Sequence, residues 1–297
     1  MLELRSVSRR FGDRTVVDDV SFTVGPGRLT GFVGANGAGK TTTMRIVLGV
    51  LAADRGEVHW QGRPITTGER RRFGYMPEER GLYPKMKVAD QITYFGQLHG
   101  MSRRDAAAST SALLEQLSLD DRSNDTLESL SLGNQQRAQI AAALVHDPIA
   151  LILDEPFSGL DPLAVDTVVS VLRERAARGV PVLFSSHQLD VVERLCDDVV
   201  VIAGGRVAAA GERDQLRHAH AGLRYRLTVD PDAGWLRDWA AANGMRVVDI
   251  DGPRAVIELS RPDLEQPLLT EALRRGPVRE FAPVVPTLSQ IFREVIR

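Results

Sequence analysis

A glycine-rich segment at residues 34–42, GANGAGKTT, has the composition of a phosphate-binding loop. It fits the pattern G-x-x-x-x-G-K-[ST], follows an apolar strand-like run and precedes a helix-like run, which is the context that this pattern needs. Glycines let backbone N–H groups curl around phosphates, and the start of a helix adds partial positive charge. We expect Lys40 to reach the β- and γ-phosphates and the Thr41 hydroxyl to ligate Mg²⁺. The predicted nucleotide-binding residues of this loop are Gly34, Asn36, Gly37, Gly39, Lys40, Thr41 and Thr42.

An acidic pair follows the apolar run ALIL at residues 150–153. Asp154 would hold Mg²⁺ directly or through a water, and Glu155 would poise a water for attack on a γ-phosphate. An acidic pair after a strand is also a common turn, so this pair is ambiguous when taken alone. Together with the glycine-rich loop it predicts a nucleotidase of the P-loop class.

The elements that must position these residues alternate between strand-like and helical runs through the first two-thirds of the chain, as in an α/β protein. Two strands near the start are predicted to be antiparallel, and three later apolar runs each predict a buried strand that ends in a turn, as parallel strands do. The predicted strands are 2–11, 17–24, 29–34, 150–156, 181–187 and 198–205, and the predicted helices are 41–50, 88–100, 103–118 and 134–146.

Length and composition exclude several classes of protein. A chain of 297 residues with 43% hydrophobic and 26% charged residues suits about two globular domains. The net charge of -2 argues against a protein that coats nucleic acid, and no nucleic-acid partner is expected. The single cysteine, Cys196, is expected to be a buried hydrophobe and fits a reducing cytosol. We find neither a secretory leader nor an apolar run long enough to cross a bilayer, which predicts a cytoplasmic chain.

A compositional break falls at residues 213–222, RDQLRHAHAG. Its histidines, His218 and His220, lack an acidic or cysteine partner nearby, so a solvated linker is preferred over a metal site. The sequence therefore predicts a first domain at 1–215 and a small α+β domain at 222–297.

The segment ESLSLGNQQR before the acidic pair places Ser131 and Gly133 just ahead of a helix-like run, and here the chain resembles the ATP-binding subunit of ABC transporters. Ser131 and Gly133 match the Leu-Ser-Gly-Gly-Gln signature of that family, whereas Leu132 replaces its first Gly and Asn134 its Gln. The resemblance covers residues 1–215. It implies an α/β P-loop NTPase fold of ABC type, with a mixed sheet core, an antiparallel β subdomain and a helical subdomain at about 86–146. It also implies ATP and Mg²⁺ as cofactors, and a head-to-tail homodimer, or a pair with a similar partner, that sandwiches two ATP molecules.

Further positions match that family by their order in the chain. Phe11 stands where the family has an aromatic that stacks on adenine, although a strand aromatic more often belongs to a core. Residues 158–161, ending at Asp161, resemble the D-loop that crosses the dimer seam. His187 ends a strand-like run where the family's switch histidine contacts the γ-phosphate.

One departure concerns Glu78, which occupies the position of the family's Mg²⁺-contacting Gln. A carboxylate is also a hard oxygen ligand for Mg²⁺, but it adds negative charge beside the phosphates. The segments PEERGLYPKM and SLGNQQR and the C-terminal domain narrow the resemblance to ABC-2 type exporters, including those for sodium efflux and antibiotic resistance. That group implies a separate transmembrane permease, which would hold the chain at the inner face of the membrane. Two alternatives stay open: a soluble ABC ATPase not coupled to transport, and an ATP-sensing regulatory module.

Overall fold

The computed structural model describes residues 1–79 and 81–295. The chain divides into two compact units, one of Met1–Arg213 with Val295 and one of Asp214–Glu294. Each has its own hydrophobic core, and each is described here by itself.

A mixed six-stranded sheet forms the centre of the first unit, in the order β10-β9-β3-β8-β7-β6. Five of its strands are parallel, and β10 runs antiparallel at one edge. The inner strands are short, mostly apolar and buried throughout, because both faces of the sheet are covered. The strands are β3 (Leu29–Val33), β6 (Phe73–Met76), β7 (Ala150–Leu153), β8 (Val182–Ser186), β9 (Asp198–Ala203) and β10 (Arg206–Glu212).

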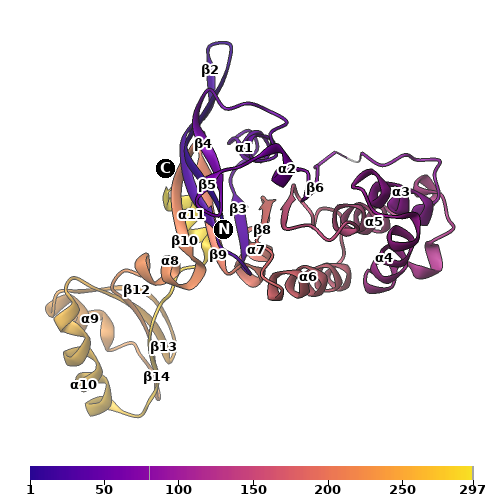
Figure 1. Ribbon diagram of the computed structural model, residues 1–297. Coiled ribbons are helices and arrows are strands. Elements are labelled where there is room, and N and C mark those ends of the chain that lie inside the picture. Colours follow the sequence, from indigo (N-terminus) through magenta and orange to yellow (C-terminus); the bar gives the residue numbers. More distant parts are fainter. Residues whose placement is uncertain (80, 296–297) are drawn as a thin grey trace. The chain divides into compact units, whose positions relative to one another are not determined.

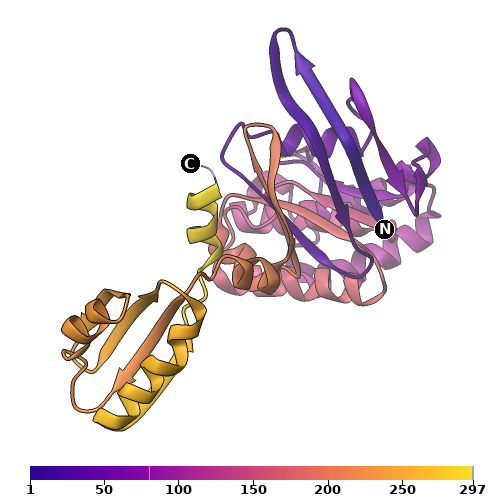
Figure 2. The same cartoon turned by 90° about the vertical axis from the view of Figure 1, so that its left-hand side faces the viewer.

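An antiparallel sheet of order β2-β1-β4-β5 makes a second layer (Figure 2). Its strands β1 and β2 form a long hairpin, as the sequence predicts. The helix α1 (Lys40–Val47) contributes Met44, Ile46 and Val47 to a core that includes residues of both sheets. The strands of this layer are β1 (Leu2–Phe11), β2 (Arg14–Val24), β4 (Arg55–Trp60) and β5 (Arg63–Pro64), and the short helix α2 (Thr67–Arg70) follows them.

Helices α6 (Pro162–Ala177) and α7 (Leu189–Leu195) pack against the mixed sheet. Successive strand residues point to opposite faces, and Gly31 lies against Val192 and Cys196 whereas Phe32 enters the core shared with α1. Helix α7 and α1 therefore cover opposite faces. Cys196 is 1% exposed, which confirms its predicted burial.

Three helices that pack on one another form a group beyond β6 (Figure 1). They are α3 (Val88–Leu98), α4 (Arg103–Gln116) and α5 (Leu132–Leu144), with the 3₁₀ turns η1 (Asp120–Arg122) and η2 (Leu127–Ser129) between the last two. The side chains of Ile92, Leu113 and Ile140 are fully buried in this group of helices.

The second unit has the element order β-α-β-β-α-β and the sheet order β12-β13-β11-β14, which is the ferredoxin-like arrangement. The two helices of this arrangement, α9 and α10, cover the same face of the sheet (Figure 1). Its elements are β11 (Arg224–Val229), α9 (Leu236–Ala242), β12 (Met245–Asp251), β13 (Arg254–Leu259), η3 (Pro262–Leu264), α10 (Glu265–Arg275), β14 (Val278–Pro283) and α11 (Leu288–Val295).

The predicted linker at 213–222 is wrong in one respect, because Arg213–Ala219 forms the helix α8. No residue of α8 is fully buried, but Arg213, Asp214, Leu216 and Arg217 are half-buried, so the segment is only partly solvated. The side chains of His218 and His220 bond to the backbone carbonyls of Asp214 and Leu216, four residues earlier. Helix-compatible residues such as Gln215, Leu216 and Arg217 explain why this polar stretch is helical.

Candidate functional site

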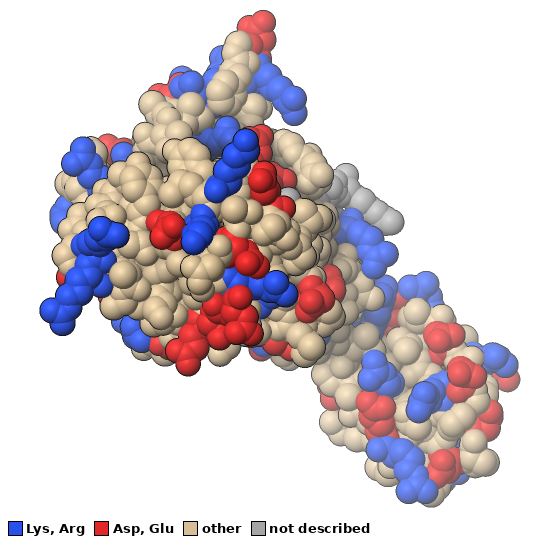
Figure 3. All heavy atoms as spheres, turned by 90° about the vertical axis from the view of Figure 1, so that its right-hand side faces the viewer, with Lys and Arg blue, Asp and Glu red and all other residues tan. Residues whose placement is uncertain are grey.

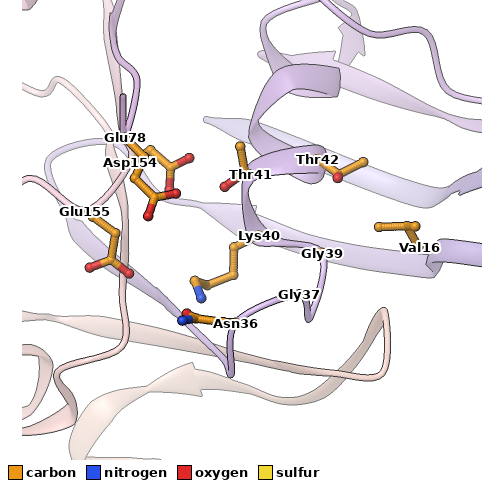
Figure 4. A pocket seen from close by; sticks show the side chains of 10 residues that line it. All are labelled: Val16, Asn36, Gly37, Gly39, Lys40, Thr41, Thr42, Glu78, Asp154 and Glu155. Carbon is orange, nitrogen blue, oxygen red and sulfur yellow. The ribbon is translucent and has the colours of Figure 1, made fainter. Parts of the chain in front are cut away.

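The residues predicted to bind nucleotide and to catalyse hydrolysis lie together at one edge of the mixed sheet. Strands β3, β6, β7 and β8 are parallel, so their carboxyl ends lie together, and each is followed by one of these residues. A cavity of about 360 Å³ opens at this edge. It is lined by Val16, Asn36, Gly37, Gly39, Lys40, Thr41, Thr42, Glu78, Asp154 and Glu155 (Figure 4).

The glycine-rich loop turns sharply from β3 into α1. Gly39 has φ 106°, in the left-handed region, and a Cβ there would lie 2.7 Å from the Val16 carbonyl oxygen. Only glycine fits this position, and helix α1 begins at the next residue with its first N–H groups near the cavity. The Lys40 ammonium donates to the Gly34 carbonyl oxygen at 2.7 Å and is 7% exposed. An anion in the cavity would therefore meet backbone donors and a buried cation.

Asp154 is 1% exposed and directly follows β7. One of its oxygens, Oδ1, accepts a hydrogen bond from the Ser185 hydroxyl at 2.5 Å. The other, Oδ2, is buried without a partner among the described residues. A buried, unsatisfied carboxylate oxygen is costly unless a ligand engages it. This atom, with the nearby Thr41 hydroxyl, fits the hard oxygen donors that Mg²⁺ prefers.

Glu155 is held in a strained backbone conformation, with φ 51°. Its N–H donates to the Ser185 hydroxyl at 2.9 Å, and its carbonyl oxygen accepts from the Gln136 side chain at 3.0 Å. The His187 Nδ1 lies 3.0 Å from the Glu155 Oε1. Two contacts thus fix the backbone of Glu155 and one holds its carboxylate, which faces the Lys40 side of the cavity in Figure 4.

Glu78 reaches the same cavity from the segment after β6. In Figure 4 its carboxylate lies beside that of Asp154, across from Thr41. The segment that carries it is tied to α5, because the Gln139 side chain donates to the carbonyl oxygens of Pro77 at 2.8 Å and Glu79 at 3.3 Å.

The residues that match the signature and the D-loop lie beside each other but outside the lining of the cavity. Ser131 caps α5 by accepting a hydrogen bond from the Asn134 N–H, and Leu132 is 57% exposed. A Cβ on Gly133 would lie 3.4 Å from the Gly159 carbonyl oxygen. Asp161 caps α6 by accepting from the Ala164 N–H at 2.8 Å.

Phe11 is 48% exposed at the end of β1, under the guanidinium of Arg9. It is outside the lining of the cavity, to which the same hairpin contributes Val16. The core alternative for Phe11 is therefore wrong, since its ring is open to solvent.

Four residues of the site escaped the sequence analysis: Val16, Gln136, Gln139 and Ser185. The signal for Ser185 was a pair of serines that ends an otherwise apolar strand. Val16 and the two glutamines carry no motif, and only long-range packing brings Val16 to the cavity and the glutamines to the backbone of the acidic segments beside it.

Charge and hydropathy of the described residues agree with the composition. On the face shown in Figure 3, Lys and Arg side chains are interspersed with Asp and Glu and form no continuous basic tract. Of the helices in residues 1–79 and 81–295, none combines the length and apolar character needed to span a membrane.

Comparison with known proteins follows the division of the chain. Residues 17–158 match the ABC transporter family model, and residues 211–296 match the model of the ATP-binding protein DrrA1-3-like C-terminal domain. The ABC transporter ATP-binding protein YhaQ of Bacillus subtilis is 36% identical over 296 residues, covering 100% of this chain and 98% of that protein. The chain belongs to the ABC transporter ATP-binding proteins. The resemblance seen in its motifs is thereby confirmed, and the family is one of ATPases.

Another relative is the Nod factor export ATP-binding protein I of Burkholderia lata, which is 37% identical over 88% of this chain and 87% of that protein. Among solved structures, an ATP-binding subunit of an ABC transporter aligns with TM-score 0.68 and 32% identity over 74% of this chain and 92% of that chain. A dimeric bacterial ABC transporter cassette, MJ0796, shares the fold at TM-score 0.65 and 21% identity, over 72% and 99% of the two chains.

Proposed function

We propose that this chain hydrolyses ATP with Mg²⁺ as one of two ATP-binding subunits and powers export through a separate transmembrane permease. Residues 1–215 would be the ATPase, and residues 222–297 an accessory domain for dimer contact or regulation. The observation that carries the proposal is the cavity at the sheet edge, where the phosphate loop, Asp154 and Glu155 converge.

Each of these residues of the site would have a separate role in hydrolysis. Lys40 would leave the Gly34 carbonyl and donate to the β- and γ-phosphate oxygens. Glu155 would accept a proton from the water whose oxygen attacks the γ-phosphorus, while ADP leaves with the bridging oxygen. His187 holds the Glu155 carboxylate and would contact the γ-phosphate from the end of β8.

Mg²⁺ would be held by the Thr41 hydroxyl, by Asp154, whose Oδ2 is unsatisfied, and by Glu78. When bound, the ion supplies positive charge to the β- and γ-phosphate oxygens. Phe11, half exposed at the tip of the hairpin, would stack on the adenine ring.

A head-to-tail homodimer explains why the signature residues lie outside the cavity of their own chain. Ser131 and Gly133 stand at the start of α5, beside the D-loop, with Leu132 open to solvent. A helix start with a hydroxyl and backbone N–H groups suits an anion, which the opposite subunit would present as its γ-phosphate. Asp161 would lie at the same seam. The dimeric form of the related-fold cassette MJ0796 supports this assembly.

An apolar hollow on the helical subdomain suits a permease. It measures about 630 Å³ and includes Tyr83 and Tyr94, which are 55% and 41% exposed. Exposed aromatic residues around a hollow mark binding surfaces. The same segment carries Glu78, so a docked permease would be linked to the nucleotide cavity. Docking would place the chain on the cytoplasmic face of the membrane, and the Nod factor export relatives favour export.

Mixing two inactive variants tests the head-to-tail ATPase. Lys40→Ala disables the phosphate loop, and Ser131→Arg blocks the signature end with a bulky cation. In a head-to-tail dimer, a mixed pair has one composite site built entirely from intact halves. Random mixing would restore about a quarter of wild-type phosphate release, because half of the dimers carry one intact site of two. If the mixture stays as inactive as the separate variants, each site is built within one chain and the proposed assembly is wrong.

A further inference from the structure

Helix α5 bonds to the backbone of both acidic segments of the cavity through two glutamines on one of its faces. Gln136 and Gln139 are three positions apart, so their side chains leave the same side of the helix. Both side chains are less than a tenth exposed. A buried hydrogen bond between two segments restricts where each of them can lie.

Gln136 holds the backbone of the residue proposed to take the proton from the attacking water. Its side-chain amide donates to the Glu155 carbonyl oxygen at 3.0 Å. The Ser158 N–H donates to the same oxygen at 3.2 Å, so loss of the glutamine bond does not leave this carbonyl unsatisfied. Glu155 has the strained φ of 51°, and a strained residue keeps its conformation only where its surroundings enforce it. The Gln136 bond is therefore better suited to aiming Glu155 than to stabilising the fold.

Gln139 holds the segment that carries Glu78. Its amide nitrogen donates to the carbonyl oxygens of Pro77 at 2.8 Å and Glu79 at 3.3 Å, the residues on either side of Glu78. Its own carbonyl oxygen, Oε1, is buried without a partner among the described residues. A buried oxygen without a partner costs free energy that an apolar side chain of the same size would avoid. Stability alone therefore does not explain an amide at this position, and the two bonds that it donates are what it adds.

The ladder of the sheet ends before the two acidic residues that these glutamines serve. Strands β6 and β7 pair as far as Met76 opposite Leu153, and the Asp154 N–H then donates to the Met76 carbonyl oxygen at 2.8 Å. Beyond this bond the two segments leave the ladder, one toward Glu78 and the other toward Glu155. The glutamines of α5 engage both segments just after that point.

We propose that Gln136 and Gln139 are positioning residues of the ATPase, Gln136 for Glu155 and Gln139 for Glu78. The inference rests on the proposed function and deepens it, because it gives α5 the task of keeping the two acidic residues in register with each other. The same helix is capped by Ser131, so a shift of its signature end reaches both acidic residues at once.

The test uses the full-length protein and the variants Gln136→Met and Gln139→Met. Methionine has about the size of glutamine and no amide, so it removes the donated bonds and keeps the packing. Each variant is the matched control for the other, because the same substitution is made on one face of one helix at similar burial. Phosphate release is measured against ATP and against Mg²⁺, and amide hydrogen exchange of the nucleotide-free protein is followed by mass spectrometry.

We expect the two variants to differ in kind. Gln136→Met should lower kcat by about 10–100-fold and leave the KM for ATP within about twofold of wild type, because a misplaced base affects the chemical step and not binding. Gln139→Met should raise the Mg²⁺ concentration at half-maximal rate by about tenfold. Amide exchange should become faster in the peptide that carries Glu155 for the first variant, and in the peptide that carries Glu78 for the second.

Equal effects of the two variants on kcat and on the Mg²⁺ requirement, or faster exchange over the whole first unit in both, would show that the glutamines only stabilise the fold and would overturn the inference. Wild-type kinetics and exchange in both variants would overturn it as well. Absence of phosphate release by the wild type would instead refute the proposed function, and the exchange data would still show whether the glutamines hold the two segments.

Discussion

The hydrogen bonds that position Asp154 and Glu155 depend on one hydroxyl group, that of Ser185. This fully buried group donates to the Asp154 Oδ1 at 2.5 Å and accepts from the Glu155 N–H at 2.9 Å. Ser185→Ala removes both bonds at once. It leaves the Asp154 carboxylate with neither oxygen engaged by a protein donor, since Oδ2 already lacks one.

The free-energy cost follows from these two losses. A hydrogen bond to a charged group contributes about 1.5–3 kcal/mol, and a buried donor left without a partner costs about 1–3 kcal/mol. We therefore expect Ser185→Ala to lower the free energy of unfolding of the first unit by about 2.5–6 kcal/mol. Ser186→Ala is the matched control, because Ser186 is also buried on β8 but accepts one bond, from the Gln188 N–H at 3.0 Å. Its expected cost is about 0.5–1.5 kcal/mol.

Urea denaturation measures the difference if the two units are observed separately. Trp60 belongs to the core of the first unit, whereas Trp235 and Trp239 belong to the second. Replacing the last two by Phe leaves a fluorescence signal that follows the first unit alone. A Ser185→Ala cost no larger than that of Ser186→Ala would refute the network and, with it, the account of how Asp154 and Glu155 are positioned.

Four further predictions concern other parts of the chain. Phe11→Ala should raise the Kd for ATP about tenfold through loss of stacking, measured by calorimetry, and an unchanged Kd would remove Phe11 from the site. Burial raises the pKa of the Cys196 thiol far above its usual value, so maleimide should label it at pH 8 only after denaturation, and rapid labelling of the native protein would contradict its burial. Burial and the adjacent His99 lower the pKa of His146 to about 4, so unfolded His146 takes up a proton near pH 6.5 while the folded form does not. Protonation of unfolded His146 should therefore make the urea midpoint of the wild type fall as the pH drops from 7.5 to 5. The midpoint of His146→Gln should fall less, and an identical dependence of the midpoint on pH in the two proteins would refute this. Deleting residues 222–297 should leave ATP binding intact, because Met1–Arg213 is compact by itself. The mass of the dimer and the rate of phosphate release would then report any role of the second unit. An insoluble product would show that the first unit does not fold independently.

Local patterns were sufficient to predict the elements that carry the chemistry. The phosphate loop is contiguous in sequence, so its glycines, Lys40 and Thr41 define both the turn and the helix that follows. The apolar run before Asp154 predicts a buried strand for the same reason, and the structure places both motifs at one sheet edge. The parallel pairing of these strands follows once each strand is recognised as a short, mostly apolar run that is buried on both faces.

Some contacts of the site depend on long-range packing, and local sequence patterns do not predict them. Ser185 meets Asp154 because β7 and β8 pair with Leu153 opposite Phe184, a register that no local pattern encodes. Gln136 reaches the Glu155 backbone from another subdomain. The helix α8 was missed because its polar, histidine-bearing composition suits a linker and a solvated helix equally well.

The most direct test of the central claim measures size and turnover together, on wild type and Glu155→Gln. If Glu155 takes the proton from the attacking water, Glu155→Gln binds ATP but does not hydrolyse it, and the closed pair persists. Gel filtration with Mg²⁺ and ATP should then show a dimer for Glu155→Gln and a monomer without nucleotide, while wild type releases phosphate at steady state. A Glu155→Gln protein that remains monomeric at saturating ATP, or a wild type that binds ATP without releasing phosphate, would contradict the account.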